Sequence, residues 1–184
     1  MQYFVMTCKG EYPTAALKKG PQLGPPWYSG RVIVGVPEPL IYTLDPERPG
    51  NIIAMYDDIK YPLIRDDLLH ALISAGVDNL QLFEAVIQDT ANKKEYNIYK
   101  AFNVVGVVSA ADMDKSVLMG ISQSRMIDTD FDSLAIDEKK AIPFKLFRLA
   151  ENVSAIIADS TVKEMVEQCK IKGMEFYDPQ DWSG

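Results

Sequence analysis

LQLFEAVIQ (residues 80–88) and YNIYKAFNVVGVVS (residues 96–109) are two largely apolar stretches separated by the polar segment DTANKKE (residues 89–95). Both stretches are rich in the β-branched, aliphatic and aromatic residues that favour strands. The polar segment has the composition and length of a hairpin loop. Together the three segments predict a long β-hairpin near the middle of the chain.

A short amphipathic helix is predicted just before this hairpin. Apolar residues recur there at helical spacing, namely Ile64, Leu68, Leu69, Leu72 and Ile73. Asp66 or Asp67 can cap the start of such a helix, and Gly76 is placed to end it in the left-handed conformation.

A strand, a helix and a second strand are predicted near the end of the chain. Ala155 to Ala158 is an apolar run typical of a buried strand. Thr161 to Glu164 fits a capping box that opens a helix, which Gly173 would close. Met174 to Tyr177 then returns as a last strand.

The first third of the chain has a different character. Residues 1–62 contain nine of the eleven prolines and equal numbers of acidic and basic side chains, so the remaining residues carry the whole net charge of −7. Tyr3 to Thr7, Arg31 to Val36 and Leu40 to Leu44 are short strand-like runs. The proline-rich segment 20–26 is expected to form an extended surface loop.

These elements predict an α+β fold in a single domain, 1–184. We expect a mostly antiparallel sheet with β-hairpins and two or three short amphipathic helices. Residues 1–62 would form a loop-rich strand-and-loop part, and residues 63–184 an acidic α+β core. Only the last strand-helix-strand unit leaves open a locally parallel arrangement.

Composition limits the classes of function. With 26 acidic and 19 basic residues and a pI of about 4.7, the chain is a poor candidate for binding nucleic acid. Cys8 and Cys169 form no metal-binding or disulfide pattern, and free thiols suit a reducing cytoplasm. The sequence shows no export signal and no apolar run long enough to span a membrane, so we expect a cytoplasmic protein that does not use a membrane.

Asp128, Asp130 and Asp132 form the most suggestive acidic cluster. In an extended chain these side chains share one face and could hold Mg²⁺ or Ca²⁺ together. An EF-hand is excluded, because its glycine and glutamate positions are Ser133 and Lys139. The favoured interpretation is a polar turn before a strand at Leu134 to Ile136.

No catalytic constellation is evident. The only histidine, His70, falls within the predicted helix and lacks a nucleophile motif, so a structural role is favoured. The pairs Asp57 with Asp58 and Asp112 with Asp114 are typical of solvated turns. We therefore expect no enzyme activity, no cofactor and no resident metal. Trp27, Tyr28, Tyr56, Tyr61, Tyr177 and Trp182 could anchor an interface, although packing in a core is favoured for each.

Consecutive blocks from Tyr56 onward resemble a known family, the bacterial polymorphic-toxin immunity proteins of immunity family eleven. The blocks are residues 64–69 (IRDDLL), 75–81 (AGVDNLQ), 99–108 (YKAFNVVGVV), 130–134 (DFDSL) and 147–152 (FRLAEN), followed by Gly173 to Phe176 with Pro179 and Trp182. The resemblance implies a non-enzymatic cytoplasmic protein that binds and neutralises a secreted toxin. It transfers no catalytic residues.

The leading hypothesis is therefore a toxin-neutralising binder, with Asp128, Asp130 and Asp132 as part of the toxin interface. The negative charge of residues 63–184 would suit a basic toxin. One alternative is a metal-dependent hydrolase that uses the same three aspartates with help from His70. Another is a secretion-system adaptor, and a homo-oligomer stays open.

Overall fold

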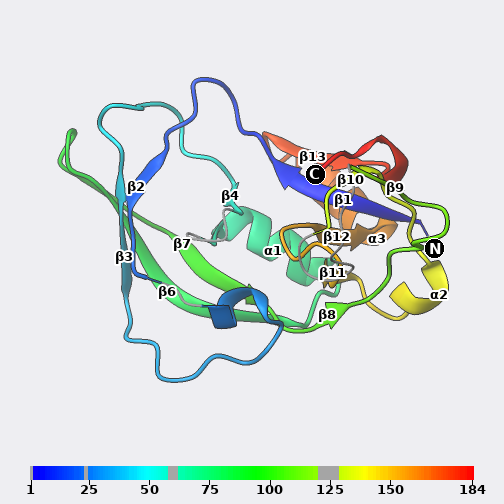
Figure 1. The fold of residues 1–184 in the computed structure, drawn as a ribbon. Helices are drawn as coiled ribbons and strands as arrows, with labels where there is room; N and C mark the ends of the chain where they lie inside the picture. The colour runs from blue at the N-terminus through cyan, green and yellow to red at the C-terminus, as the bar shows by residue number, and fades with distance from the viewer. Residues whose placement is uncertain (1, 23–24, 58–61, 120–128) are drawn as a thin grey trace.

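Two β-sheets and the helix between them make up most of the structure (Figure 1). The computed structural model describes residues 2–22, 25–57, 62–119 and 129–184. Helix α1 (Asp66–Ser74) packs between the sheets, and α3 (Ser160–Gln168) packs beside it. The α+β prediction is confirmed.

The larger sheet has six strands and contains the predicted hairpin. Its order is β2 (Leu17–Lys19), β3 (Leu40–Leu44), β6 (Leu80–Asp89), β7 (Lys94–Val104), β5 (Leu63–Arg65) and β4 (Met55–Tyr56). β6 and β7 pair from Leu80 opposite Val104 to Asp89 opposite Lys94, so the loop is shorter than the polar segment. All neighbours are antiparallel except β3 and β6, which are parallel.

The second sheet has five strands and joins the two ends of the chain. Its order is β13 (Met174–Tyr177), β1 (Tyr3–Cys8), β12 (Ile156–Asp159), β11 (Leu146–Leu149) and β8 (Val107–Val108). β12 and β13 both pair antiparallel with β1, so β1 separates the strands of the predicted strand-helix-strand unit. Only β8 and β11 are parallel in this sheet.

Short elements complete the described part of the chain. A two-stranded ribbon pairs β9 (Val117–Leu118) with β10 (Phe131–Ser133). Helix α2 (Glu138–Ala141) has one turn. Two 3₁₀ turns are η1 (Pro25–Tyr28) and η2 (Pro179–Asp181). No helix of the described residues has the length and apolarity needed to cross a bilayer.

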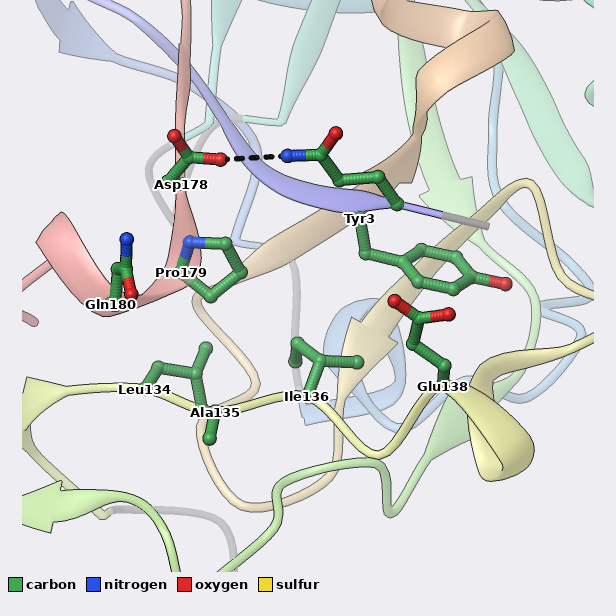
Figure 2. A pocket seen from close by; sticks show the side chains of 9 residues that line it. Tyr3, Leu134, Ala135, Ile136, Glu138, Asp178, Pro179 and Gln180 are labelled. Atoms are coloured by element: carbon green, nitrogen blue, oxygen red, sulfur yellow. Dashed lines mark hydrogen bonds between the residues drawn. The ribbon is translucent and has the colours of Figure 1, made fainter.

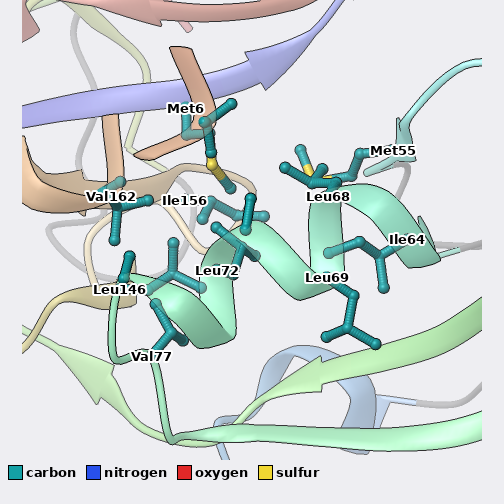
Figure 3. Packing of buried hydrophobic residues seen from close by; sticks show 14 of the residues in the cluster. Met6, Met55, Ile64, Leu68, Leu69, Leu72, Val77, Leu146, Ile156 and Val162 are labelled. Carbon is teal, nitrogen blue, oxygen red and sulfur yellow. The ribbon is translucent and has the colours of Figure 1, made fainter. Parts of the chain in front are cut away.

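The central core lies where α1 meets both sheets (Figure 3). Leu68 and Leu72 of α1 are at most 1% exposed and lie near Met6 of β1 and Ile156 of β12. The helical spacing in the sequence therefore marks most of the buried stripe of α1, but Ile73, which the pattern also included, is 52% exposed. Two further cores cover the outer faces of the sheets, and Trp27 stacks on Phe83 in one of them, with ring centroids 4.9 Å apart. Trp27 and Tyr56 are buried, as favoured from the sequence.

The predicted strand at Arg31 to Val36 was wrong, since this segment is an extended loop without ladder pairing. Side-chain amides replace the ladder. Gln81 Nε2 donates to the Ile33 carbonyl at 2.6 Å, and the Ile33 N–H donates to Gln81 Oε1 at 2.8 Å. Asn103 Nδ2 donates to the Arg31 carbonyl at 2.8 Å.

Both helix starts also differ from the prediction. The N-cap of α1 is Arg65, and Asp67 binds the Arg65 guanidinium instead of capping from outside the helix. The cap of α3 is Asp159, whose carboxylate accepts the Val162 N–H at 2.9 Å, so the helix opens before the proposed capping box. The helix ends at Gln168 with Cys169 as its C-cap, and Gly173 lies in the turn that follows.

Candidate functional site

Asp130, just before strand β10, and Asp132, within it, are both exposed. Phe131 between them is 0% exposed and packs into the core outside the five-stranded sheet. The alternation expected of an extended chain is therefore present at these two positions. The predicted strand at Leu134 to Ile136 was misplaced by three residues, because the strand begins at Phe131 and includes Asp132. Asp128 lies outside the described residues.

The C-terminal segment lies along β10. Phe131 N–H donates to the Gly184 carbonyl at 2.8 Å, and Gly184 N–H donates back to the Phe131 carbonyl at 3.1 Å. Leu134 N–H donates to the Pro179 carbonyl at 3.2 Å. These bonds place Asp178 and η2, which includes Asp181, beside the segment that carries Asp130 and Asp132.

We call residues 129–141 and 178–184 together the acidic face. These two segments contain six carboxylate side chains, namely Asp130, Asp132, Asp137, Glu138, Asp178 and Asp181. Their only basic residues are Lys139 and Lys140, and Lys140 lies 3.7 Å from Asp137. The acidic face therefore has a negative potential suited to a cationic partner.

A hollow of about 290 Å³ opens between the two segments of the acidic face. Leu134, Ala135 and Ile136 form one wall, and Pro179 with Gln180 forms the other (Figure 2). Tyr3 of β1 closes one end, where the Glu138 carboxylate lies beside its ring. Asp178 lines the opposite end and accepts a hydrogen bond from Gln2 Nε2 at 3.1 Å. We call this hollow the Tyr3 pocket.

Carboxylates surround the buried ring of Tyr3. Burial raises the pKa of the Tyr3 hydroxyl, and the negative charges of Asp159 and Glu138 raise it further. Asp159 is 0% exposed and pairs with Tyr3 across β1 and β12. The Tyr3 hydroxyl thus stays protonated at neutral pH, and the pocket keeps the negative potential of the carboxylates nearby.

Of the other candidates from the sequence, Trp182 lies within the acidic face, and the Asp112 N–H donates to the Ala135 carbonyl at 2.8 Å beside it. His70 is exposed on α1 and does not line the Tyr3 pocket. Asp112 is paired with Lys115 at 2.6 Å, and Asp57 lies beyond β4 of the other sheet. Asp58 and Tyr61 are outside the described residues. Cys8 is half-buried and Cys169 is exposed, both as free thiols. Among the described residues, no group of three or more His, Cys, Asp or Glu side chains could hold a metal ion.

Other hollows have less specific linings. One hollow of about 470 Å³ has Pro21, Pro37 and Pro39 in its lining, and the one charged residue among its nine lining residues is Lys19. Another of about 300 Å³ contains Arg65 with Asp67 and Lys172 with Glu11, which already form ion pairs with each other. The Tyr3 pocket differs from both because two carboxylates and no basic residue line it.

A family model described as "Immunity protein family (Imm11)" matches residues 63–181, more than half of the chain. The chain belongs to the Imm11 family. The resemblance seen in the sequence blocks is thereby confirmed. No curated protein sequence matches the chain. Every residue lining the Tyr3 pocket falls within the Imm11 match except Gln2 and Tyr3, which β1 contributes.

The Imm11 block Phe147 to Asn152 is a structural hub for the acidic face. Asn152, 6% exposed, donates to the Thr129 carbonyl at 3.1 Å and accepts the Ser154 N–H at 3.2 Å. The backbone carbonyl of Glu151 accepts a hydrogen bond from the Thr129 N–H at 2.9 Å. The Glu151 carboxylate accepts one from the Ser109 hydroxyl at 2.5 Å. This block therefore fixes the chain immediately before Asp130. The sequence marked the block through the family resemblance alone.

Proposed function

We propose that this protein binds and neutralises a cognate toxin in the cytoplasm of the bacterium that makes the toxin. Membership in the Imm11 family carries the proposal, because the family is one of immunity proteins. The acidic face supports a cationic toxin as the partner, since six carboxylates there oppose only two lysines. Neutralisation by binding needs no catalytic group in the immunity protein.

The contact would include Asp130 and Asp132, with Asp128 beside them in sequence. Asp130, just before β10, and Asp132, within it, are both exposed, so a partner can reach them without unfolding the chain. Opposite charges would speed the encounter and align the two proteins. Protection requires nearly complete occupancy, which corresponds to a Kd of about 1 nM or lower. Such a contact buries about 1,600 Å² in total, so it extends beyond β10 over the acidic face.

The deciding experiment is co-expression with the C-terminal domain of the large protein encoded beside this gene. Growth of the host and co-purification of the two proteins at moderate salt are scored together. Rescue with a stable complex supports neutralisation by binding. If the neighbouring domain is toxic but this protein neither binds it nor restores growth of the host, the proposal is overturned.

A further inference from the structure

The Tyr3 pocket combines three features. Its walls are apolar at Ile136 and Pro179, its end is the ring of a buried tyrosine, and its two carboxylates, Glu138 and Asp178, lie at opposite ends (Figure 2). None of its nine lining residues is basic. A ligand that matches all three features has an apolar stem and a positively charged head.

The size of the pocket further limits the kind of ligand that it can hold. Its volume of about 290 Å³ is at the bottom of the range for sites that enclose a whole small molecule, about 300–1,000 Å³. A single long side chain fits this scale better than a cofactor does. Arginine and lysine have the required aliphatic stems and cationic heads.

We propose that the Tyr3 pocket receives an arginine or lysine side chain of the bound toxin. This inference rests on the proposed function, since it names the group that the toxin would present. The apolar stem would lie between Ile136 and Pro179. The cationic head would reach Glu138 or Asp178.

Rigidity of the pocket favours such an anchor. Tyr3 is 2% exposed and is held in β1. The ring of Pro179 fixes its backbone φ angle, and the Pro179 carbonyl accepts a hydrogen bond from the Leu134 N–H. A preformed pocket loses little conformational entropy on binding. Anchors of this kind, with a side chain seated in a pocket, account for most of the binding energy in many interfaces.

The test compares three variants with the wild-type protein for affinity to the toxin. E138Q/D178N removes both pocket carboxylates with little change in shape. A135M keeps both carboxylates but fills the hollow, since Ala135 lines it. E47Q/E95Q is the matched control, because it removes two exposed carboxylates from the six-stranded sheet and its loops, at the other end of the molecule (Figure 1).

We expect E138Q/D178N and A135M each to raise Kd roughly 10- to 100-fold, mainly through faster dissociation, and the control to change it less than about threefold. Unchanged melting temperatures establish that the variants fold. Substitution of each basic residue of the toxin by alanine should then identify one whose loss adds nothing further to E138Q/D178N, as expected for a direct partner.

The outcomes separate the two proposals. A wild-type protein that does not bind the toxin overturns the proposed function. If the wild type binds tightly but E138Q/D178N and A135M bind as well as the control, the function stands and the pocket inference is wrong. Loss of affinity in E138Q/D178N but not in A135M also overturns the inference, because it shows an effect of surface charge without occupancy of the hollow.

Discussion

The backbones of Gly10 and Gly173 cross so closely that a Cβ on Gly173 would lie 2.4 Å from the Gly10 Cα. The Gly173 carbonyl accepts hydrogen bonds from the N–H groups of Lys9 and Gly10, at 3.0 and 3.3 Å. This crossing fastens the start of β13 to the end of β1. It therefore supports the segment that runs on to Asp178 and η2.

Gly173→Ala should lower the free energy of unfolding by about 2–4 kcal/mol. Gly173 has φ +80°, which disfavours any side chain, and the clash with Gly10 adds to that cost. Gly35→Ala is the matched control, because Gly35 has φ +74° but no atom near the added Cβ. It should cost only about 1 kcal/mol. Urea unfolding of both variants measures the difference, and equal losses would contradict a role for the crossing.

Asn152→Ala should destabilise the protein by about 1–3 kcal/mol. The substitution leaves the Thr129 carbonyl and the Ser154 N–H without the partner that Asn152 supplies. Asn97→Ala, at an exposed position of β7, should change stability by less than about 0.5 kcal/mol. Denaturant midpoints of the two variants test this. If Asn152→Ala loses no more stability than Asn97→Ala, the hydrogen bonds of Asn152 do not hold the acidic face in place.

The ion pair between Arg65 and Asp67 should contribute to stability at neutral pH but not in acid. Two hydrogen bonds of 2.8 and 2.7 Å to the Arg65 guanidinium hold the pKa of the Asp67 carboxyl below its ordinary value of 3.8. A lowered folded-state pKa stabilises the protein above the unfolded-state pKa, and this stabilisation disappears as the pH falls through the folded-state pKa.

A double-mutant cycle of D67N and R65Q measures this pair. We expect a coupling energy of about 0.5–1 kcal/mol at pH 7, because Asp67 is half exposed and its pair is screened by solvent. The coupling should disappear as the pH falls through the lowered folded-state pKa of Asp67. A coupling that is the same above and below that pKa would show that the interaction does not depend on the charge of the carboxylate.

Association with the toxin should slow as salt is added. If the acidic face steers a cationic partner, the association rate constant should fall about tenfold or more between low salt and roughly 0.5 M salt. Replacement of Asp128, Asp130 and Asp132 by alanine should reduce both the rate at low salt and its dependence on salt, without unfolding the protein. Stopped-flow mixing provides the rates. An association rate constant that does not change with salt would exclude electrostatic steering. An unchanged affinity in the triple variant would show that these residues are not part of the interface.

Divalent cations should leave the melting temperature unchanged. A metal-dependent hydrolase built on Asp128, Asp130 and Asp132 would be stabilised by Mg²⁺, Mn²⁺ or Ca²⁺, since a ligand bound only to the folded state at 100 times its Kd contributes about 2.7 kcal/mol. Thermal unfolding with each ion, and with EDTA as the control, distinguishes the two hypotheses. A clear upward shift with one ion would revive the hydrolase.

Elements with strong local patterns were predicted well from the sequence. The hairpin of β6 and β7 and the buried stripe of α1 follow from periodicities within a few residues. The strand predicted at Arg31 to Val36 was wrong, and the reason is not local. Its β-branched residues favour a strand, but its backbone is bound by Gln81 and Asn103, which are distant in sequence.

The candidate site was predictable only in part for the same reason. The exposure of Asp130 and Asp132 on either side of buried Phe131 follows from strand alternation and was recovered, although the strand was placed three residues too late. The Tyr3 pocket brings together β1, the segment after β10 and the turn at η2. Its formation depends on pairing β1 with both β12 and β13, and no local pattern in any of the three segments indicates that pairing.

The convergence of both ends of the chain on the Tyr3 pocket affects how this protein can be handled. Gln2 and Gln180 both line the pocket, so a purification tag or a fluorescent protein inserted beside either residue would extend from its border. Such a fusion would compete with a partner for the same space and could imitate a loss-of-binding variant. The loop between β6 and β7, Thr90 to Lys93, lies at the opposite end of the molecule (Figure 1). An epitope inserted in that loop leaves the acidic face open.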